Sequence, residues 1–417
     1  MDKDTTTSTF VKLLNPLNLK NALSSFLNLD AYVKKLTTEK WLYLMLFAQL
    51  HQLPSRKQLV TKLQGTEDLQ KAINLESISD SQLSRKDRNV DPNLLEHLFT
   101  EVVQQMKRGT KPAHYLQTMG GPLYLVDAST ISLCLSQCQW ATFRPRQRKG
   151  GVKIHLRTIC LPDGVLPDKA VLQAAIHSDR SQMNELVIEP GALYIFDRGY
   201  NDYEAFDHYC RPETLITFVT RLKSNAVVEV IEELPVVPGS PITREARVRL
   251  GSGKTRMAHE LRLIETTDSK GKLIQLITND WGRSAEEIGE LYRKRWQIEL
   301  FFKWAKQHLQ IKKFYGQSER AVYNQIWIAL ITYCLLRLLQ QRTKSPHTLF
   351  RLLQHVRDTL FKPLLDLIQL LHRKPTRTSR GRRRVDPEEE FRQFVKQLEE
   401  EGMESIEGLY ADVMEVI

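Results

Sequence analysis

The sequence is poor in cysteine and lacks long apolar runs. Its five cysteines are odd in number, scattered along 417 residues and without C-x-x-C pairs, so neither a structural zinc site nor a disulfide framework is expected. The longest apolar runs, residues 41–50 and 326–336, are too short to cross a bilayer, and we identify no N-terminal signal sequence. We therefore expect a cytoplasmic protein with reduced thiols and no membrane partner.

Positive charge, in contrast, is present in excess. The chain carries a net charge of +11, with a hydrophobic fraction of 41% and a charged fraction of 26% that are typical of a soluble globular protein. Residues 385–417 are strongly acidic, so the rest of the chain is more basic than the average. This surplus favours a polyanionic partner but does not identify one.

The most informative stretch is residues 292–306, YRKRWQIELFFKWAK, which contains no Pro or Gly and predicts a helix. At 100° per residue, Tyr292, Arg295, Glu299 and Lys306 share one arc of about 60°, and much of the remaining surface is apolar. A carboxylate on such a packed helix is costly unless it is paired or binds a metal. A simple surface pair of Arg295 with Glu299 would contribute about 0.2–0.5 kcal/mol, but three cationic or phenolic groups exceed what pairing needs.

Two earlier acids each end a short apolar run that predicts a buried strand. The first run, residues 123–127, ends in Asp127, and the second, residues 192–197, ends in Asp197. Considered singly, Asp127 is equally a turn or helix cap, and Asp197 a turn aspartate paired with Arg198. The position of both acids at strand ends makes them candidates for a shared site.

The surrounding pattern alternates strands and helices. Residues 131–138 alternate in polarity and are expected to pair back on the first strand as a hairpin, and residues 152–161 predict a third strand. Helical segments are expected before and after the strand that ends in Asp197. Residues 214–280 are rich in strands, with candidates at residues 215–220, 226–231, 246–250, 260–264 and 273–278.

Residues 1–112 are predicted to be helical. Thr37 or Thr38, Ser55 and Ser79 are suitable N-caps, and Ser79 forms a capping-box pattern with Gln82. Basic residues lie among these helices. Such a module could place a helix in the major groove of DNA, or it could be a solvated bundle that supports the next domain, and the sequence leaves both open.

The spacing Tyr-x2-Arg-x3-Glu-x6-Lys within residues 292–306 resembles, at every position, the signature of the insertion-sequence-four family of bacterial transposases. The run from Asp197 to Tyr200 also resembles the family's motif around its second aspartate. The resemblance covers roughly residues 120–340. It implies a DDE triad on a ribonuclease-H-like α/β fold, with a mixed sheet and a β-rich insertion that follow the helical N-terminal domain.

The resemblance assigns the triad to Asp127, Asp197 and Glu299. Phosphodiester cleavage is helped by two Mg²⁺ ions held by carboxylates, and Mn²⁺ is an accepted substitute. Asp127 would bridge both ions, while Asp197 and Glu299 would each hold one.

The same resemblance makes three other motif residues, Tyr292, Arg295 and Lys306, contacts to phosphate and DNA ends. Arg198, Lys153 and the basic loop of residues 144–149 are further candidates for backbone contact, or else a solvated basic surface. His155 is expected to be a structural histidine rather than a ligand.

Relatives that form a DNA hairpin use a tryptophan on the last strand of the insertion. The corresponding strand, residues 273–278, has none, and Trp281 follows it out of register. A hairpin intermediate is therefore not expected, although the triad chemistry does not depend on it.

We expect four parts: residues 1–112, helical and binding the DNA ends; residues 113–340, catalytic, with the insertion at about 214–280; residues 341–372, a helical extension; and residues 373–417, a basic linker and an acidic amphipathic tail. The tail could dock on the body, contact a second subunit or stay mobile.

The leading hypothesis is a DNA transposase that cleaves transposon ends and joins them to target DNA. It would act on double-stranded DNA, as a homodimer in the DNA complex and associated with the nucleoid. The alternatives are a metal nuclease or resolvase of the same fold and an inactive descendant that only binds DNA.

Overall fold

The computed structural model describes residues 7–26, 29–109, 121–144, 149–161, 164–267 and 271–373. A 10-stranded sheet runs through its centre in the order β2-β3-β1-β5-β6-β10-β9-β8-β7, and β4 also pairs with β3. The strands are β1 Leu123–Cys134, β2 Thr142–Arg144, β3 Lys149–Leu161, β4 Gly164–Ala174, β5 Leu193–Phe196, β6 Thr217–Arg221, β7 Val228–Leu234, β8 Ile242–Leu250, β9 Leu261–Thr267 and β10 Leu273–Thr278.

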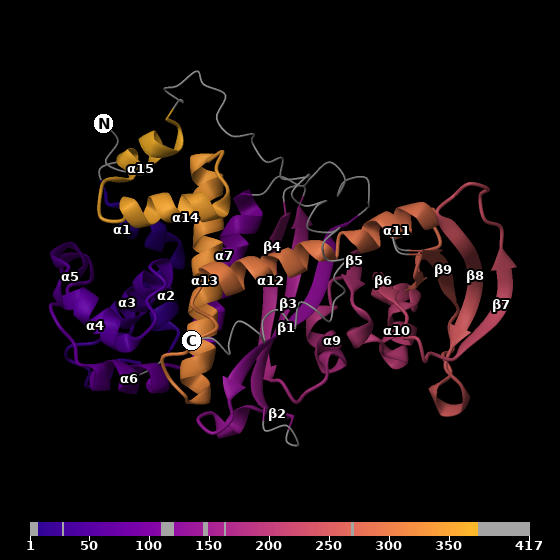
Figure 1. Cartoon of the computed structure of the whole chain (residues 1–417), viewed down its shortest axis with the longest axis horizontal. Helices are drawn as coiled ribbons and strands as arrows, with labels where there is room; N and C mark the ends of the chain where they lie inside the picture. The colour runs from indigo at the N-terminus through magenta and orange to yellow at the C-terminus, as the bar shows by residue number, and fades with distance from the viewer. Residues whose placement is uncertain are drawn as a thin grey trace.

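The N-terminal helices lie at one end of the molecule and strands β7 and β8 at the other, while α11 and α12 run across the sheet (Figure 1). The α-helices are α1 Thr9–Leu14, α2 Leu19–Ser24, α3 Thr38–Leu50, α4 Arg56–Gln64, α5 Glu67–Ile73, α6 Asp80–Asn89, α7 Pro92–Gly109, α9 Met183–Leu186, α10 Tyr203–Tyr209, α11 Ala285–Arg293, α12 Trp296–His308, α13 Glu319–Thr343, α14 Leu349–Asp358 and α15 Leu364–Leu371. Two short 3-10 turns flank β5, η4 Asp179–Gln182 and η5 Arg198–Tyr200.

The predicted helix starts in the N-terminal part are confirmed. Thr37, Ser55 and Ser79 each accept a hydrogen bond from the backbone N–H three residues further on, and Ser79 completes a capping box with Gln82. Each cap satisfies one of the N–H groups that a helix leaves unpaired at its first turn.

The sheet is mixed, and the predicted fold class is confirmed. Strand β1 is antiparallel to β3 and parallel to β5, which is parallel to β6. Strands β10, β9, β8 and β7 then continue the sheet as antiparallel neighbours beyond β6. The β-rich insertion therefore extends the central sheet and does not form a separate one.

Two details of the predicted strand pattern are wrong. The alternating segment that was expected to fold back as a hairpin instead continues β1, which pairs with β3 from Tyr124 to Cys134. The strand β4 was not predicted; it contains Pro167, a residue that sheets tolerate mainly at edges and irregular points. The register between β3 and β4 shifts between Arg157 and Thr158, which accommodates Pro167 at an irregular point of an outer strand.

The helix predicted over residues 292–306 is two helices. α11 and α12 are separated by Lys294 and Arg295, whose N–H groups bond to the carbonyls three residues back, at 3.0 Å and 3.1 Å. Both residues keep right-handed helical dihedral angles, so the two helices follow one another nearly end to end (Figure 1). At Lys294 and Arg295 the helix is more tightly wound, but the chain keeps its direction across the sheet.

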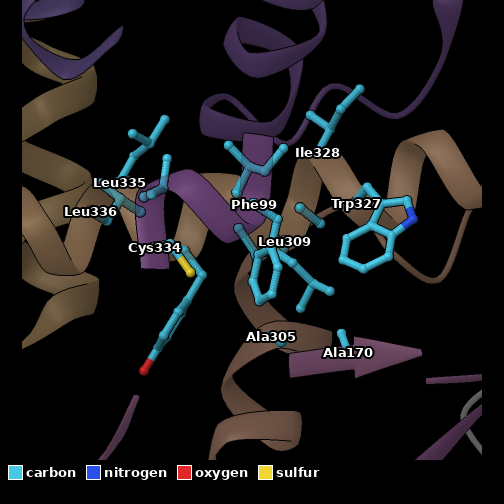
Figure 2. Packing of buried hydrophobic residues seen from close by; sticks show 14 of the residues in the cluster. Phe99, Ala170, Ala305, Leu309, Trp327, Ile328, Cys334, Leu335 and Leu336 are labelled. Carbon is cyan, nitrogen blue, oxygen red and sulfur yellow. The ribbon is translucent and has the colours of Figure 1, made fainter. Parts of the chain in front are cut away.

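Helix α13 joins the N-terminal helices to the sheet. Figure 2 shows its residues Trp327 and Leu335 packed in one cluster with Phe99 of α7, Leu309 just after α12 and Ala170 of β4. The rings of Phe99 and Trp327 are 5.4 Å apart. α12 therefore rests on a core that the N-terminal part also builds.

Helix α13 is also long and apolar enough, by length and composition, to cross a membrane. Within the molecule, however, 94% of its apolar window is buried, which is the behaviour of a core helix in a soluble protein.

Several predictions about the outer parts of the chain stay open. The predicted loop of residues 144–149 and the tail of residues 373–417 lie largely outside the described residues. A single core cluster contains residues from Phe10 to Leu371, so the proposed domain boundaries near residues 112 and 340 stay predictions.

Candidate active site

The two predicted aspartates lie side by side where the parallel pairing of β1 and β5 ends. The last paired residues are Val126 and Phe196, so Asp127 and Asp197 are the next residues on their strands. β5 stops there and Asp197 is the N-cap of the turn η5, whereas β1 continues through Asp127 and stays paired with β3. In open sheets, ligands bind at the carboxyl ends of parallel strands.

Glu299 reaches the same place from α12, which packs across β1. The guanidinium of Arg295 donates a hydrogen bond to Glu299 Oε1, and its Nη1 lies 3.8 Å from Asp127 Oδ2. The Arg295 side chain is only 8% exposed. The pair of Arg295 with Glu299, which the sequence offered as a simple surface pair, thus exists, but its guanidinium is buried and also approaches Asp127.

Burial and mutual repulsion shift the pKa values of these acids. Burial raises the pKa of Asp127 to about 7; Arg295 opposes this rise, and Glu299 and Asp197 add to it. Burial also raises the pKa of Glu299, against the effect of Arg295, and Asp197 raises it further. The three carboxylates are therefore close enough for the charge of one to affect the ionisation of another.

Burial alone would lower the pKa of Arg295, but Glu299, Tyr292, Asp127 and Asp197 together raise it. Its guanidinium carbon lies 5.7 Å from the ring centre of Tyr292 and 5.3 Å from that of Trp296. The Nε atom of Arg295 is buried without a hydrogen-bond partner. A permanently charged guanidinium therefore stands between the acids and two aromatic rings.

The remaining predicted contact residues differ in their surroundings. Lys306 is half-buried on α12, two turns beyond Glu299. Arg198 is exposed and makes no ion pair with any described residue. Lys153 is engaged, because its ammonium donates to Asp179 Oδ1 at 2.8 Å and to the carbonyl of His177 at 2.9 Å. Its role as a DNA contact stays a prediction that this pairing does not favour.

A cavity of about 330 Å³ opens beside Asp197. Besides Asp197, Arg198 and Gly199, it is lined by Lys223, Ser224 and Asn225, which are exposed residues of the turn after β6. The sequence interpretation missed this turn. The available signal was its position directly after a parallel strand, the same position that had marked the aspartates.

The donor atoms of the triad suit a hard divalent cation. Carboxylate oxygens are the ligands that Mg²⁺ prefers, and Mg²⁺ is usually bound by one or two carboxylates together with water and substrate phosphates. Among the described residues, no group of three or more His, Cys, Asp or Glu side chains already forms a cage for a metal ion. The set fits such an ion in chemistry, with the oxygens of a substrate completing the shell.

Comparison with known sequences identifies the class of protein. Residues 118–335 match the family model described as "Transposase DDE domain". A Sinorhizobium fredii protein named "Putative transposase y4zB" is 34% identical over 270 residues, which are 64% of this chain and 74% of that protein. A Geobacillus stearothermophilus protein named "Probable transposase for insertion sequence element IS5377" is 28% identical over 267 residues, 64% of this chain and 68% of that protein.

A solved structure, the piggyBac transposase synaptic complex with hairpin DNA, aligns with a TM-score of 0.43 at 10% identity, covering 90% of this chain and 81% of that one. At this score the likeness supports no inference about the present chain.

The chain belongs to the DDE transposase family. It is a DNA transposase, an enzyme of the nuclease and polynucleotidyl transferase type, and divalent metal ions and DNA are the cofactor and partner that the family implies.

Proposed function

We propose that Asp127, Asp197 and Glu299 are the catalytic triad and hold two Mg²⁺ ions, for which Mn²⁺ can substitute. The observation that supports this most strongly is that Arg295 contacts both Asp127 and Glu299, while Asp197 follows the strand that pairs with the one carrying Asp127. When bound, the ions supply Lewis-acid stabilisation of the attacking and leaving oxygens of a phosphodiester. By the family resemblance, Asp127 would be the ligand shared by the two ions.

The residues of the chain prepare this site before any substrate arrives. Arg295 offsets the mutual repulsion of Asp127 and Glu299, whose side chains are 17% and 30% exposed. A phosphate that enters next to Arg295 competes with Glu299 for the guanidinium, since Arg binds carboxylate and phosphate with the same fork of donors. Binding of DNA would thereby release Glu299 for its role as a ligand.

DNA contacts are assigned to the cations around the triad. Arg198 is exposed at the rim of the cavity beside Asp197, and Lys223 lies on the opposite loop. Arg198 and Lys223, together with Arg295, Lys306 and the phenol of Tyr292, would contact the phosphates of a DNA end. The N-terminal helices would bind further along the end, and the enzyme would act as a homodimer, in the cytoplasm and on the nucleoid.

The decisive experiment uses the full chain, Mg²⁺ and DNA with the terminal repeats of the element. The expected result is strand cleavage at the repeat followed by joining of the free 3′-hydroxyl to target DNA. Asp197→Asn and Glu299→Gln should abolish both steps but retain DNA binding. Cleavage without joining would indicate a nuclease instead, and cleavage by either variant at the normal rate would refute the triad.

A further inference from the structure

Beneath the site, a chain of buried hydrogen bonds leads to the turn that carries Asp197. His155 of β3 is fully buried, with its Nδ1 3.2 Å from the hydroxyl of Tyr200 and its Nε2 2.7 Å from the side-chain nitrogen of Gln173. The side-chain oxygen of Gln173 accepts a hydrogen bond of 2.8 Å from Gln182. Four side chains from β3, β4, η4 and η5 are thus joined in one line.

The line lies on the other face of the sheet from Asp127. His155 is opposite Ala128 in the register of β1 and β3, and alternate residues of a strand point to opposite faces. Tyr200 packs on the same face, with its ring 6.2 Å from that of Phe196. It is only 1% exposed and cannot contact DNA. Its effect must act through the chain that it anchors.

The bond directions in this line determine the tautomer of His155. Because Gln173 uses its oxygen to accept from Gln182, its NH₂ group faces His155 and can only donate. The Nε2 atom of His155 is therefore an acceptor, and the ring proton resides on Nδ1, where it is donated to the Tyr200 hydroxyl. Burial lowers the pKa of His155 to about 4, which keeps the ring neutral near pH 7.

Tyr200 in turn closes the turn of Asp197. Its backbone N–H bonds to the carbonyl of Asp197 at 3.0 Å. From the other side, Asp179 presses on the turn so closely that a Cβ atom at Gly199 would lie 2.9 Å from its Oδ2, and Lys153 holds Asp179 in place. The three residues that follow Asp197 are therefore fixed from two directions.

We propose that Tyr200 and His155 are positioning residues for the metal-binding carboxylate of Asp197. The hydrogen-bond chain from Gln182 to Tyr200 fixes the η5 turn, and the turn fixes the direction of that carboxylate. The proposal rests on the proposed role of Asp197 in the triad. Partners of this kind, which orient a metal ligand from behind, typically change metal affinity or activity by about 10–100-fold when they are removed.

The test compares Tyr200→Phe with Tyr209→Phe in the full chain. Tyr209, the last residue of α10, is also a buried tyrosine, but among the described residues its hydroxyl has no hydrogen-bond partner, so its loss should be neutral. Mn²⁺ affinity by calorimetry and the kcat of strand cleavage should fall about 10–100-fold in Tyr200→Phe alone, with the KM for DNA unchanged. Equal behaviour of the two variants would overturn the proposal.

A second variant avoids the buried core altogether. Gln182→Leu, at a half-buried position, removes the donor to the Gln173 oxygen, so that the Gln173 amide can rotate by 180°. NMR of ¹⁵N-labelled histidine should then show that His155 gains the Nε2–H tautomer. The affinity for Mn²⁺ should fall in the same variant. An Nε2–H tautomer in the unchanged protein would refute the chain of bonds. If Asp197→Asn left cleavage intact, the triad itself would be wrong; if it abolished cleavage while Tyr200→Phe had no effect, only the positioning role would fail.

Discussion

The outer strands of the insertion and the site beside Asp197 handle charge in opposite ways. On β7, β8 and β9, arginines and glutamates pair across neighbouring strands, as Arg244 does with Glu233 and Glu265. Arg256, in the loop between β8 and β9, pairs with Glu229 of β7. At the site, three carboxylates share one guanidinium. Exposed cations such as Arg198 have no ion-pair partner there among the described residues.

This difference separates structural from functional charge. A cross-strand pair at the surface satisfies both partners and contributes little to stability. At the site, burial raises the pKa of Asp127 and of Glu299, and such perturbed groups gather at functional sites. The carboxylates of the site have too few positive partners, and a metal ion can supply positive charge to them. The exposed cations beside them, such as Arg198, can bind the negative charge of a DNA phosphate.

The largest expected effect is the loss of catalysis on removing a triad charge. Asp197→Asn should reduce strand cleavage by at least about 10³-fold, since the stabilisation that a bound metal provides is several kcal/mol. Glu233→Gln, on the paired outer strands, should leave cleavage unchanged. Single-turnover cleavage of end DNA with Mg²⁺ measures both, and a similar loss in the two variants would remove the distinction between the regions.

The next largest effect is on folding. Arg295→Gln leaves Asp127 and Glu299 without their buried partner and should lower the free energy of unfolding by about 3–5 kcal/mol. Arg244→Gln, which breaks a half-exposed pair, should cost about 0.2–1 kcal/mol. Urea denaturation without metal or DNA compares the two, and equal losses would show that Arg295 is an ordinary surface partner.

A smaller effect concerns pH. The pKa of Asp127 is about 7 in the folded chain and near 3.8 as an unperturbed group, so the folded state binds this proton more tightly than the unfolded state. The stability that the proton provides is complete below about pH 4 and is lost as the pH rises through about 7. Metal-free wild type should therefore lose stability relative to Asp127→Asn over this window, and a constant difference in unfolding free energy would contradict the raised pKa.

The smallest effect is expected for DNA affinity. Arg198→Gln and Lys223→Gln should each weaken binding to all sequences about equally and reduce the slope of log affinity against log salt by about 1. Arg256→Gln removes a cation that Glu229 already neutralises and should change the slope less. Fluorescence anisotropy over a range of salt concentrations measures the slopes, and indistinguishable values would mean that pairing does not decide which cations meet DNA.

Part of the arrangement follows from local sequence pattern. Asp197 directly follows a short apolar run, and Glu299 occupies a spacing motif, so their positions after a strand and on a helix need no tertiary information. The strand at Asp127 was predicted wrongly: β1 runs on past Asp127 because β3 pairs with it, and that partner is remote in sequence. The expected end of the strand is in fact the point where β5 stops.

What could not be predicted depends on packing across elements. The approach of Arg295 to Asp127 requires α12 to cross β1, and the spacing on a single helix indicates only Glu299. Lys153 was offered as a DNA contact or as part of a solvated basic surface, and local pattern does not reveal its pairing with Asp179, 26 residues away in η4. Strand β4 was not predicted, and its tolerance of Pro167 depends on a shift of register with β3.

The hydrogen bonds between β6 and β10 have a mechanical consequence. Because they join the insertion to the parallel strands as one sheet, the distal strands cannot swing like a hinged flap without breaking that ladder. A nucleotide bound at β7 and β8, the far end of the sheet, would consequently stay at a constant distance from the scissile bond. The sheet would then fix the length of DNA between these two points.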